Sequence, residues 1–150
     1  MRRPSHGDAG ATSVEFALVL PLLVALLGIG AFFAWSFYVQ AQIDRAAERA
    51  ARYAAVPTTA GGWSFCKDDL LAKVNADLVA STVEDAELTL SDSTGAAPAT
   101  CAGGRQPVGY VRVRIAHTYS NPFSSIVATL TPLSGTATVV GAGQTRVEAP

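Results

Sequence analysis

Glu15 is the residue whose type and position most clearly predict chemistry. It is a carboxylate at the mouth of a long apolar run, because no charged residue occurs from Phe16 to Val39. An ionisable side chain beside a hydrocarbon core is costly and is a functional-site hypothesis by default. Paired with a cation, such a group becomes tolerable and marks one depth along an apolar helix, which would fix the register between helices. The plain alternative is a helix-start acid that the macrodipole stabilises.

The other polar candidates do not form a catalytic pattern. His117 lies in a predicted strand with no patterned acid or nucleophile near it, so a structural or surface histidine is expected. The adjacent acids Asp68 and Asp69 are more simply explained as first-turn residues of a predicted helix, where the macrodipole favours acids, than as metal ligands. The segment 141–143 (Gly-Ala-Gly) follows a strand but lacks the remainder of a dinucleotide-binding fingerprint. We therefore expect a protein that is not an enzyme and that binds no metal or cofactor.

The arginines and cysteines of the second half have ordinary explanations. A basic face could be formed by Arg105, Arg112 and Arg114. The exposed, solvated face of a strand accounts for the same arginines without any ligand. The net charge of −1 does not recruit nucleic acid or acidic substrates. Cys66 and Cys101 are too few for a disulfide scaffold and are not at metal-ligand spacing. One disulfide between them is expected if this part of the chain faces an oxidising compartment.

The element that positions Glu15 is one long helix. A helix needs about 20 apolar residues to cross a hydrocarbon core roughly 30 Å thick, and the uncharged run after Glu15 is long enough to span it with some tilt. Strong helix formers continue through residues 40–55, with no breaker until Pro57 and with Glu48 and Arg52 at the i,i+4 spacing of an ion pair. The alanine-rich stripe of this part suits close packing against a sheet or another helix. Five aromatic residues at the far end of the span resemble an interfacial belt (Phe32, Phe33, Trp35, Phe37 and Tyr38).

A small domain with helices and strands follows the long helix. Residues 67–80 are a helix candidate with an apolar face. Residues 86–91 and 108–119 alternate apolar and polar side chains, which predicts strands. The remaining segments are a small-residue loop, a short helix or packed loop, and one or two short strands (92–107, 122–133 and 135–147). The predicted fold class is α+β, with a long N-terminal transmembrane helix and a small exported domain that contains an antiparallel sheet.

The start of the long helix resembles a known family. Gly10, the four residues after it, Glu15-Phe16 and the apolar run that begins at 17–23 resemble the TadE-like family, the pseudopilins or minor pilins of Flp-type (type IVb, tight-adherence) pilus systems. The resemblance covers roughly residues 7–50. It implies that a prepilin peptidase cuts after Gly10 and leaves a short basic leader on the cytoplasmic side. Phe16 stands where the Flp pilin motif usually has tyrosine, which favours a minor pilin over the major one.

The resemblance also implies an order of parts and a set of partners. The parts are a cleaved leader at 1–10, a transmembrane and extended helix at 11–56, and an extracytoplasmic α+β domain at 57–150. Gly10 and Ala11 form the processing site, and Glu15 with Phe16 forms the assembly site. Cleavage would place a new ammonium at Ala11, close to Glu15 of the same chain or of a staggered neighbour. The implied partners are prepilin peptidase, other pilins or pseudopilins, the inner-membrane assembly platform and membrane lipid.

Orientation and processing have alternatives. Arginines flank both ends of the span, so the positive-inside rule is close to a tie. The short N-terminal tail and the distal cysteines favour a cytoplasmic N-terminus, with the C-terminal domain outside the cytoplasmic (inner) membrane. The competing hypothesis is a signal-anchored extracytoplasmic binding module with no pilus role, which predicts no cut or a cut near Ala41. The first residue of the mature protein separates these hypotheses, since it is Ala11, Gln42 or Met1.

Overall fold

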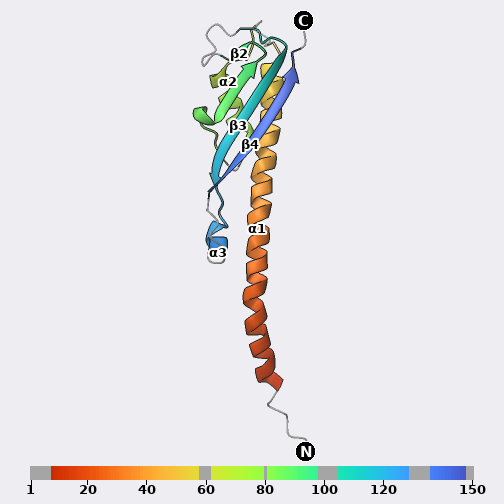
Figure 1. Cartoon of the computed structure of the whole chain (residues 1–150), viewed down its shortest axis with the longest axis vertical. Helices are drawn as coiled ribbons and strands as arrows, with labels where there is room; N and C mark the ends of the chain where they lie inside the picture. The colour runs from red at the N-terminus through yellow and green to blue at the C-terminus, as the bar shows by residue number, and fades with distance from the viewer. Residues whose placement is uncertain (1–7, 58–61, 80, 98–104, 129–135, 148–150) are drawn as a thin grey trace, which may run out of the picture. The chain divides into compact units, whose positions relative to one another are not determined.

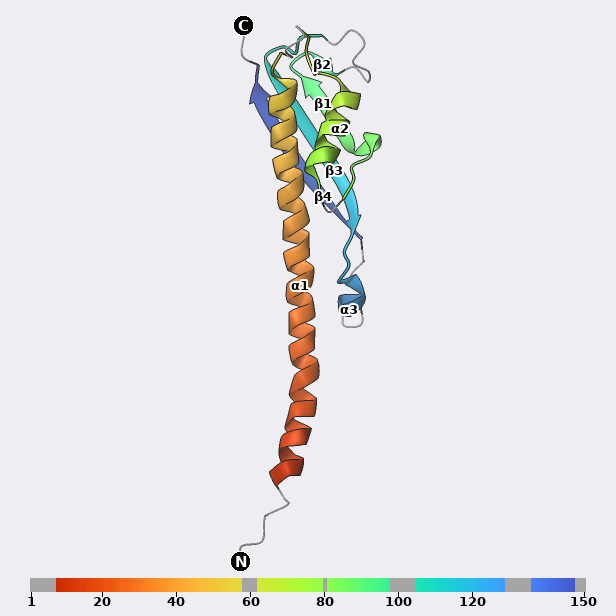
Figure 2. The same ribbon diagram turned by 180° about the vertical axis from the view of Figure 1, so that it is seen from behind.

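The computed structural model describes residues 8–57, 62–79, 81–97, 105–128 and 136–147, and it describes the side chains of these ranges except at 8–12, 126 and 127. The helices are α1 (Asp8–Ala54), α2 (Lys67–Asp77), the 3-10 helix η1 (Asp85–Glu87) and α3 (Ser124–Ala128). The strands are β1 (Leu88–Asp92), β2 (Gly95–Ala96), β3 (Tyr110–Ser120) and β4 (Thr136–Arg146). Figure 1 and Figure 2 show these elements from opposite sides. The predicted α+β class is confirmed.

The chain divides into two compact units, which are described separately. The helix unit contains Met1–Trp35 and Ser120–Gly135, and the sheet unit contains Ser36–Tyr119 and Thr136–Pro150. α1 contributes to both, because its helical backbone continues without interruption from end to end and passes through Pro21. A proline inside a helix removes one backbone hydrogen bond, which long apolar helices tolerate. The predicted continuous helix is therefore confirmed.

α1 begins inside the predicted leader. The sequence pattern predicts an irregular segment up to Gly10, whereas the helix starts at Asp8. An acid in the first turn is favoured by the macrodipole, which extends the helix backwards by these few residues. Residues 1–7 lie outside the described part of the chain. At its other end α1 stops at Ala54, three residues before Pro57, as the predicted breaker requires.

The sheet has the strand order β2-β1-β3-β4, and neighbouring strands run antiparallel. β1 pairs with β3 in a register that places Leu90 opposite Val113. On the other side of β3, the hydroxyls of Thr118 and Thr138 lie 3.0 Å apart and mark the register with β4. The inward-facing positions of β3 alternate with exposed ones, as the predicted strand pattern requires.

α1 packs on β4 through small residues. The stripe of α1 that is buried in the sheet unit has exposed fractions of at most 3% (Val39, Ile43, Ala46, Ala47, Ala50, Ala51 and Ala54). Gly141 and Gly143 of β4 lie against this stripe, and a Cβ built on Gly141 would be 2.7 Å from Ile43 Cγ2. A Cβ on Gly143 would overlap the backbone carbonyl of Ala47. Helix and strand approach this closely because glycine leaves the space open.

β4 is longer and more regular than the sequence predicts. The pattern predicts one or two short strands around the segment 141–143, whereas β4 is one strand of 11 residues. The two glycines do not break it, because their role is the contact with α1. Val147 N–H donates to Gly109 O, so the odd-numbered residues of β4 bond to β3 and the even-numbered residues face the free edge. At that edge Gln40 Nε2 of α1 donates to Val140 O at 3.1 Å.

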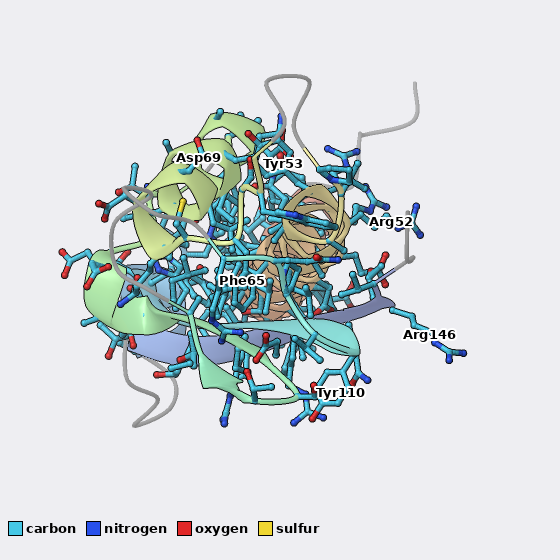
Figure 3. All side chains as sticks on the ribbon, turned by 90° about the horizontal axis from the view of Figure 1, so that it is seen from above. Arg52, Tyr53, Phe65, Asp69, Tyr110 and Arg146 are labelled. Carbon is cyan, nitrogen blue, oxygen red and sulfur yellow. The ribbon has the colours of Figure 1, made fainter. Side chains whose placement is uncertain are left out.

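α2 and the residues before β1 complete the sheet unit. α2 ends at Asp77, slightly earlier than predicted, and buries Leu70 and Val74. Figure 3 shows α1 and α2 on the same face of the sheet, with Phe65 in the interior between them. The first two residues of the predicted strand 86–91 belong to η1, which a capping box holds in a tight turn. β2 lies within the predicted loop, where it pairs with β1.

Candidate functional site

The first part of α1 carries an apolar surface that the described chain does not cover. Eleven large apolar side chains from Val14 to Phe33 are exposed, including Phe16 at 64% and Leu18 at 74%. Burying one such side chain is worth about 1.5–3 kcal/mol, so leaving all of them in water would cost tens of kcal/mol. α1 is the one described helix that is long and apolar enough to cross a membrane. The chain is therefore consistent with a single-pass membrane protein.

Glu15 is the charged group on this surface. Its side chain is exposed, and the ion pairs of the described residues do not include it. In the helical register it shares a face with Val19 and Leu22, which are apolar. The backbone nitrogen of Ala11 lies about one helical turn before it, roughly 6 Å along the axis. An ammonium created at Ala11 would therefore lie within electrostatic reach of the Glu15 carboxylate.

The predicted scissile bond between Gly10 and Ala11 lies in the first turn of α1, and not in an extended segment. The amide groups of a first turn have no intrahelical acceptor. Glycine disfavours a helix by about 1 kcal/mol relative to alanine. This turn is therefore easier to unwind than the interior of α1. The role of Gly10 and Ala11 in processing stays a prediction.

Within the helix unit, Asn121 and Phe123 attach the segment before α3 to α1. Asn121 is 1% exposed, its Nδ2 donates to Phe32 O at 3.1 Å, and its Oδ1 accepts the Phe123 N–H at 3.0 Å. The Phe123 ring meets the Trp35 ring edge to face, with centroids 6.4 Å apart. Among the predicted belt aromatics, Trp35 therefore contacts Phe123 through its ring and Phe32 contacts Asn121 through its backbone carbonyl. The belt itself stays a prediction. α3 occupies part of the predicted 122–133 helix, whose residues after Ala128 lie outside the described chain.

An ion pair in the sheet unit shows that Arg105 is not on the solvated strand face that the sequence favoured for the three arginines. Asp92 has a fully buried carboxylate that Arg105 binds with two nitrogens, at 2.6 and 3.1 Å. Thr94 and the Val108 N–H also donate to this carboxylate. Burial alone would raise the pKa of Asp92, but these donors outweigh it and hold the pKa well below its usual range. Arg105, whose guanidinium lies over the Phe65 ring, is therefore not part of a free basic face.

Arg112 and Arg114 are on the exposed face of β3, as the alternation predicts. Arg112 lies over the Tyr110 ring, 5.4 Å from its centroid, and one of its nitrogens is 3.4 Å from Gln144 Oε1 of β4. These contacts are those of a solvated strand face. The expected solvated strand face is therefore confirmed for Arg112 and Arg114, whereas Arg105 precedes β3 and pairs with Asp92.

His117 has an acidic partner that the sequence pattern does not reveal. Its Nδ1 lies 2.9 Å from Glu87 Oε2, and Thr118 N–H donates to the other oxygen of this carboxylate. Burial raises the pKa of Glu87, but hydrogen bonds from the Glu84 backbone, His117 and Thr118 outweigh it and lower the pKa overall. His117 is buried, and its Nε2 has no hydrogen-bond partner within the described residues. No described serine, threonine or cysteine side chain bonds to His117, so the described residues show no nucleophile activated by it.

The remaining candidates have structural surroundings. Asp68 and Asp69 lie in the first turn of α2, as predicted, and Tyr53 OH donates to Asp69. The described residues contain no cluster of three side chains that could hold a metal ion. Cys66 is fully buried and disulfide-bonded. Cys101 lies outside the described residues, so its pairing with Cys66 stays a prediction.

Comparison with known proteins concerns the N-terminal part of the chain. Residues 10–52 match the family model described as TadE-like protein. The match covers less than a third of the chain, and these residues form its TadE-like segment. The TadE-like segment contains Gly10, Glu15 and Phe16 and ends just before α1 does, which confirms the resemblance drawn from these residues. No curated protein and no solved structure matches the chain.

Proposed function

We propose that the chain is a minor pilin, or pseudopilin, that takes part in the assembly of a Flp-type (type IVb) pilus. The observation that carries the proposal is a single carboxylate, Glu15, at the start of an apolar helix surface within the TadE-like segment. Such a surface needs lipid around it before assembly and the apolar helices of other subunits after it. The same helix would therefore serve as the anchor and as the assembly element.

In this proposal a prepilin peptidase removes residues 1–10 by cutting between Gly10 and Ala11. The cut creates an ammonium one turn from Glu15, on the same helix or on a neighbouring one. A carboxylate in apolar surroundings is strongly disfavoured alone and tolerable when paired. Pairing at a single depth would then align neighbouring helices, since any other offset leaves the charge without a partner. Phe16, exposed beside Glu15, would contribute to the same contact.

The proposed location is the cytoplasmic (inner) membrane, with the N-terminus in the cytoplasm and the sheet unit outside, followed by incorporation into a pilus. The proposed partners are the prepilin peptidase, other pilins or pseudopilins, and the assembly platform in the membrane. The chain is proposed to act as a structural or assembly protein and not as an enzyme. The competing function, a signal-anchored binding module without a pilus role, needs the same apolar helix but no cut after Gly10.

The mass of the mature protein tests the proposal. We expect the mass of residues 11–150 for the natural chain and the full-length mass for Gly10→Leu, because a bulky residue blocks the cut. Gly7→Leu is the matched control, since it changes a glycine of the leader away from the scissile bond, and it should be processed normally. A mature chain that starts at Met1 or Gln42, or a Gly10→Leu variant with the processed mass, would show that the proposal is wrong.

A further inference from the structure

A hydrogen bond within the helix unit places Asn121 at a defined point along α1. Asn121 Nδ2 donates to Phe32 O at 3.1 Å, and the Phe123 ring meets the Trp35 ring three residues further along the helix. Figure 1 and Figure 2 both show the helix that follows, α3, alongside α1. Residues 121–128 are termed the α3 segment. Its depth in a membrane follows from the depth of Phe32.

The depth of Phe32 is set by the charges on either side of it. α1 has no charged residue between Glu15 and Asp44, which are about 43 Å apart along the helix axis. Charged side chains are strongly disfavoured in a hydrocarbon core, which is roughly 30 Å thick. Phe32 is about 26 Å from Glu15 and about 18 Å from Asp44 along the axis. Every placement of the core between the two charges therefore contains Phe32, so the α3 segment begins at hydrocarbon depth.

The sequence around the α3 segment carries no charge that would oppose its entry into lipid. From Ile115 to Thr145 the chain has no aspartate, glutamate, lysine or arginine, and this run is longer than the uncharged run of α1. The α3 segment itself reads Asn-Pro-Phe-Ser-Ser-Ile-Val-Ala. Its polar groups are therefore one carboxamide, two hydroxyls and the backbone.

The polar groups at the start of the α3 segment are bonded within the protein. The Phe123 N–H donates to Asn121 Oδ1 at 3.0 Å, and the Ser124 N–H donates to Asn121 O at 3.0 Å. Pro122, between them, has no N–H to satisfy. Asn121 is 1% exposed, and both ends of its carboxamide are used. An unbonded backbone group in a bilayer core costs several kcal/mol, so this internal bonding is what a segment in lipid requires.

The outer side of this contact is left open by the described residues. Pro122 and Ser125 are exposed, and on α1 the side chains of Leu27 and Phe33 are 66% and 52% exposed. The α3 segment therefore continues the apolar surface of α1 and does not cover it. Because that surface requires lipid around it, the same surroundings reach the α3 segment.

We propose that the α3 segment is a second membrane element, which lies beside α1 in the hydrocarbon core and has lipid acyl chains as its partner. Asn121 attaches it to Phe32 and bonds the N–H groups of its first turn. The chain then meets the bilayer at two points that are 89 residues apart in the sequence. The inference rests on α1 crossing a membrane, and not on processing at Gly10 or on the pilus role.

Photo-crosslinking identifies what surrounds the α3 segment. The full-length chain, reconstituted in vesicles of phosphatidylcholine and phosphatidylglycerol, carries p-benzoylphenylalanine in place of Ser125, which is exposed. We expect a product heavier by the mass of one phospholipid. Leu22, exposed on α1, is the positive control, and Thr89, exposed on β1, is the negative control. The proposal is overturned if the probe at Ser125 gives no lipid adduct, or gives only a crosslink to a second copy.

A smaller change excludes insertion that the apolar probe itself drives. Ser125→Cys is nearly isosteric, and Cys66 does not compete for the reagent because it is disulfide-bonded. With a membrane-impermeant maleimide on both sides of the vesicles, Ser125→Cys should react at least about tenfold more slowly than Thr89→Cys, which corresponds to about 1.4 kcal/mol. Unfolding in SDS should abolish the difference. Equal rates in intact vesicles, or a difference that persists in SDS, would contradict the proposal.

The controls separate this inference from the membrane span and from the proposed function. A lipid adduct at Leu22 but not at Ser125 overturns the inference alone. The absence of an adduct at both positions overturns the inference together with the span. The Gly10→Leu chain should give the same adduct at Ser125, because the contact with Phe32 does not depend on processing, and its loss there would contradict the inference.

Discussion

Replacing Gly143 with alanine tests how closely α1 must approach β4. The added Cβ would overlap the Ala47 carbonyl and would lie 2.7 Å from the Glu48 backbone nitrogen. Both groups are helix backbone, so no side-chain rotation relieves the overlap, and helix or strand must shift. Overpacking a core typically lowers the free energy of unfolding by about 1–3 kcal/mol. Because the neighbouring atoms here are helix backbone and cannot rotate away, we expect a loss of about 3 kcal/mol. Alanine is favoured over glycine in a strand, and this preference offsets less than about 1 kcal/mol of the loss.

The expected loss is large enough to measure as a shift in Tm. The sheet unit has roughly 100 residues, so each kcal/mol lowers its Tm by about 4–8 °C, and Gly143→Ala should lower it by about 10–20 °C. Thermal unfolding of the full-length chain in detergent can be followed by Trp63 fluorescence in a Trp35→Phe background. Gly30→Ala is the matched control, because, apart from the neighbouring backbone of α1 itself, no atom of the described residues lies within 4 Å of its added Cβ. A Gly143→Ala shift below about 4 °C, or no larger than that of Gly30→Ala, would refute the close approach.

Three further predictions concern charge and covalent structure. The pKa of Asp92 is depressed in the folded chain, so its stabilisation is complete above about pH 4–5 and is lost as pH falls below the unfolded value of about 3.9. Asp92→Asn should therefore lower the free energy of unfolding at pH 7 by on the order of 3 kcal/mol. It should also make Tm fall less steeply between about pH 5 and 2.5. An unchanged dependence of Tm on pH in this range would contradict the ion pair. The Glu15→Ala chain should be inserted into the membrane and cut normally but should not assemble into pili. Normal piliation with this variant would show that Glu15 does not set the register between helices. Reduction should add two hydrogens to the mass and lower the stability by about 3–4 kcal/mol if Cys66 pairs with Cys101, while an unchanged mass would show free thiols.

The parts of the fold that follow from local patterns could be predicted from the sequence. The uncharged run after Glu15 and the alanine-rich segment before Pro57 predict α1 because helix length and composition are local properties. The alternation of β3 predicts its buried and exposed faces for the same reason. The residues around Gly10 and Glu15 predicted the TadE-like segment, because the motif is contiguous in the chain.

The parts that depend on distant contacts could not be predicted in the same way. Gly141 and Gly143 suggested a break in the last strand, since their partner, α1, is about 100 residues earlier in the chain. Arg105 looked like a surface cation because nothing local indicates that Asp92 is buried beside it. The acidic partner of His117 could not be predicted, because Glu87 is 30 residues earlier in the chain and lies on a separate element. In each case the deciding interaction is tertiary, and a single-sequence pattern carries no information about it.

The contact between α1 and β4 also constrains when the sheet unit can fold. Gln40 and Val140, which meet at the edge of the sheet, are 100 residues apart. A ribosome therefore completes the alanine stripe of α1 long before it makes the strand that covers it. During that interval the stripe is exposed, and alanine, with its small apolar area, makes it a weak site for aggregation. The sheet unit therefore cannot reach its final form before β4 has been synthesised.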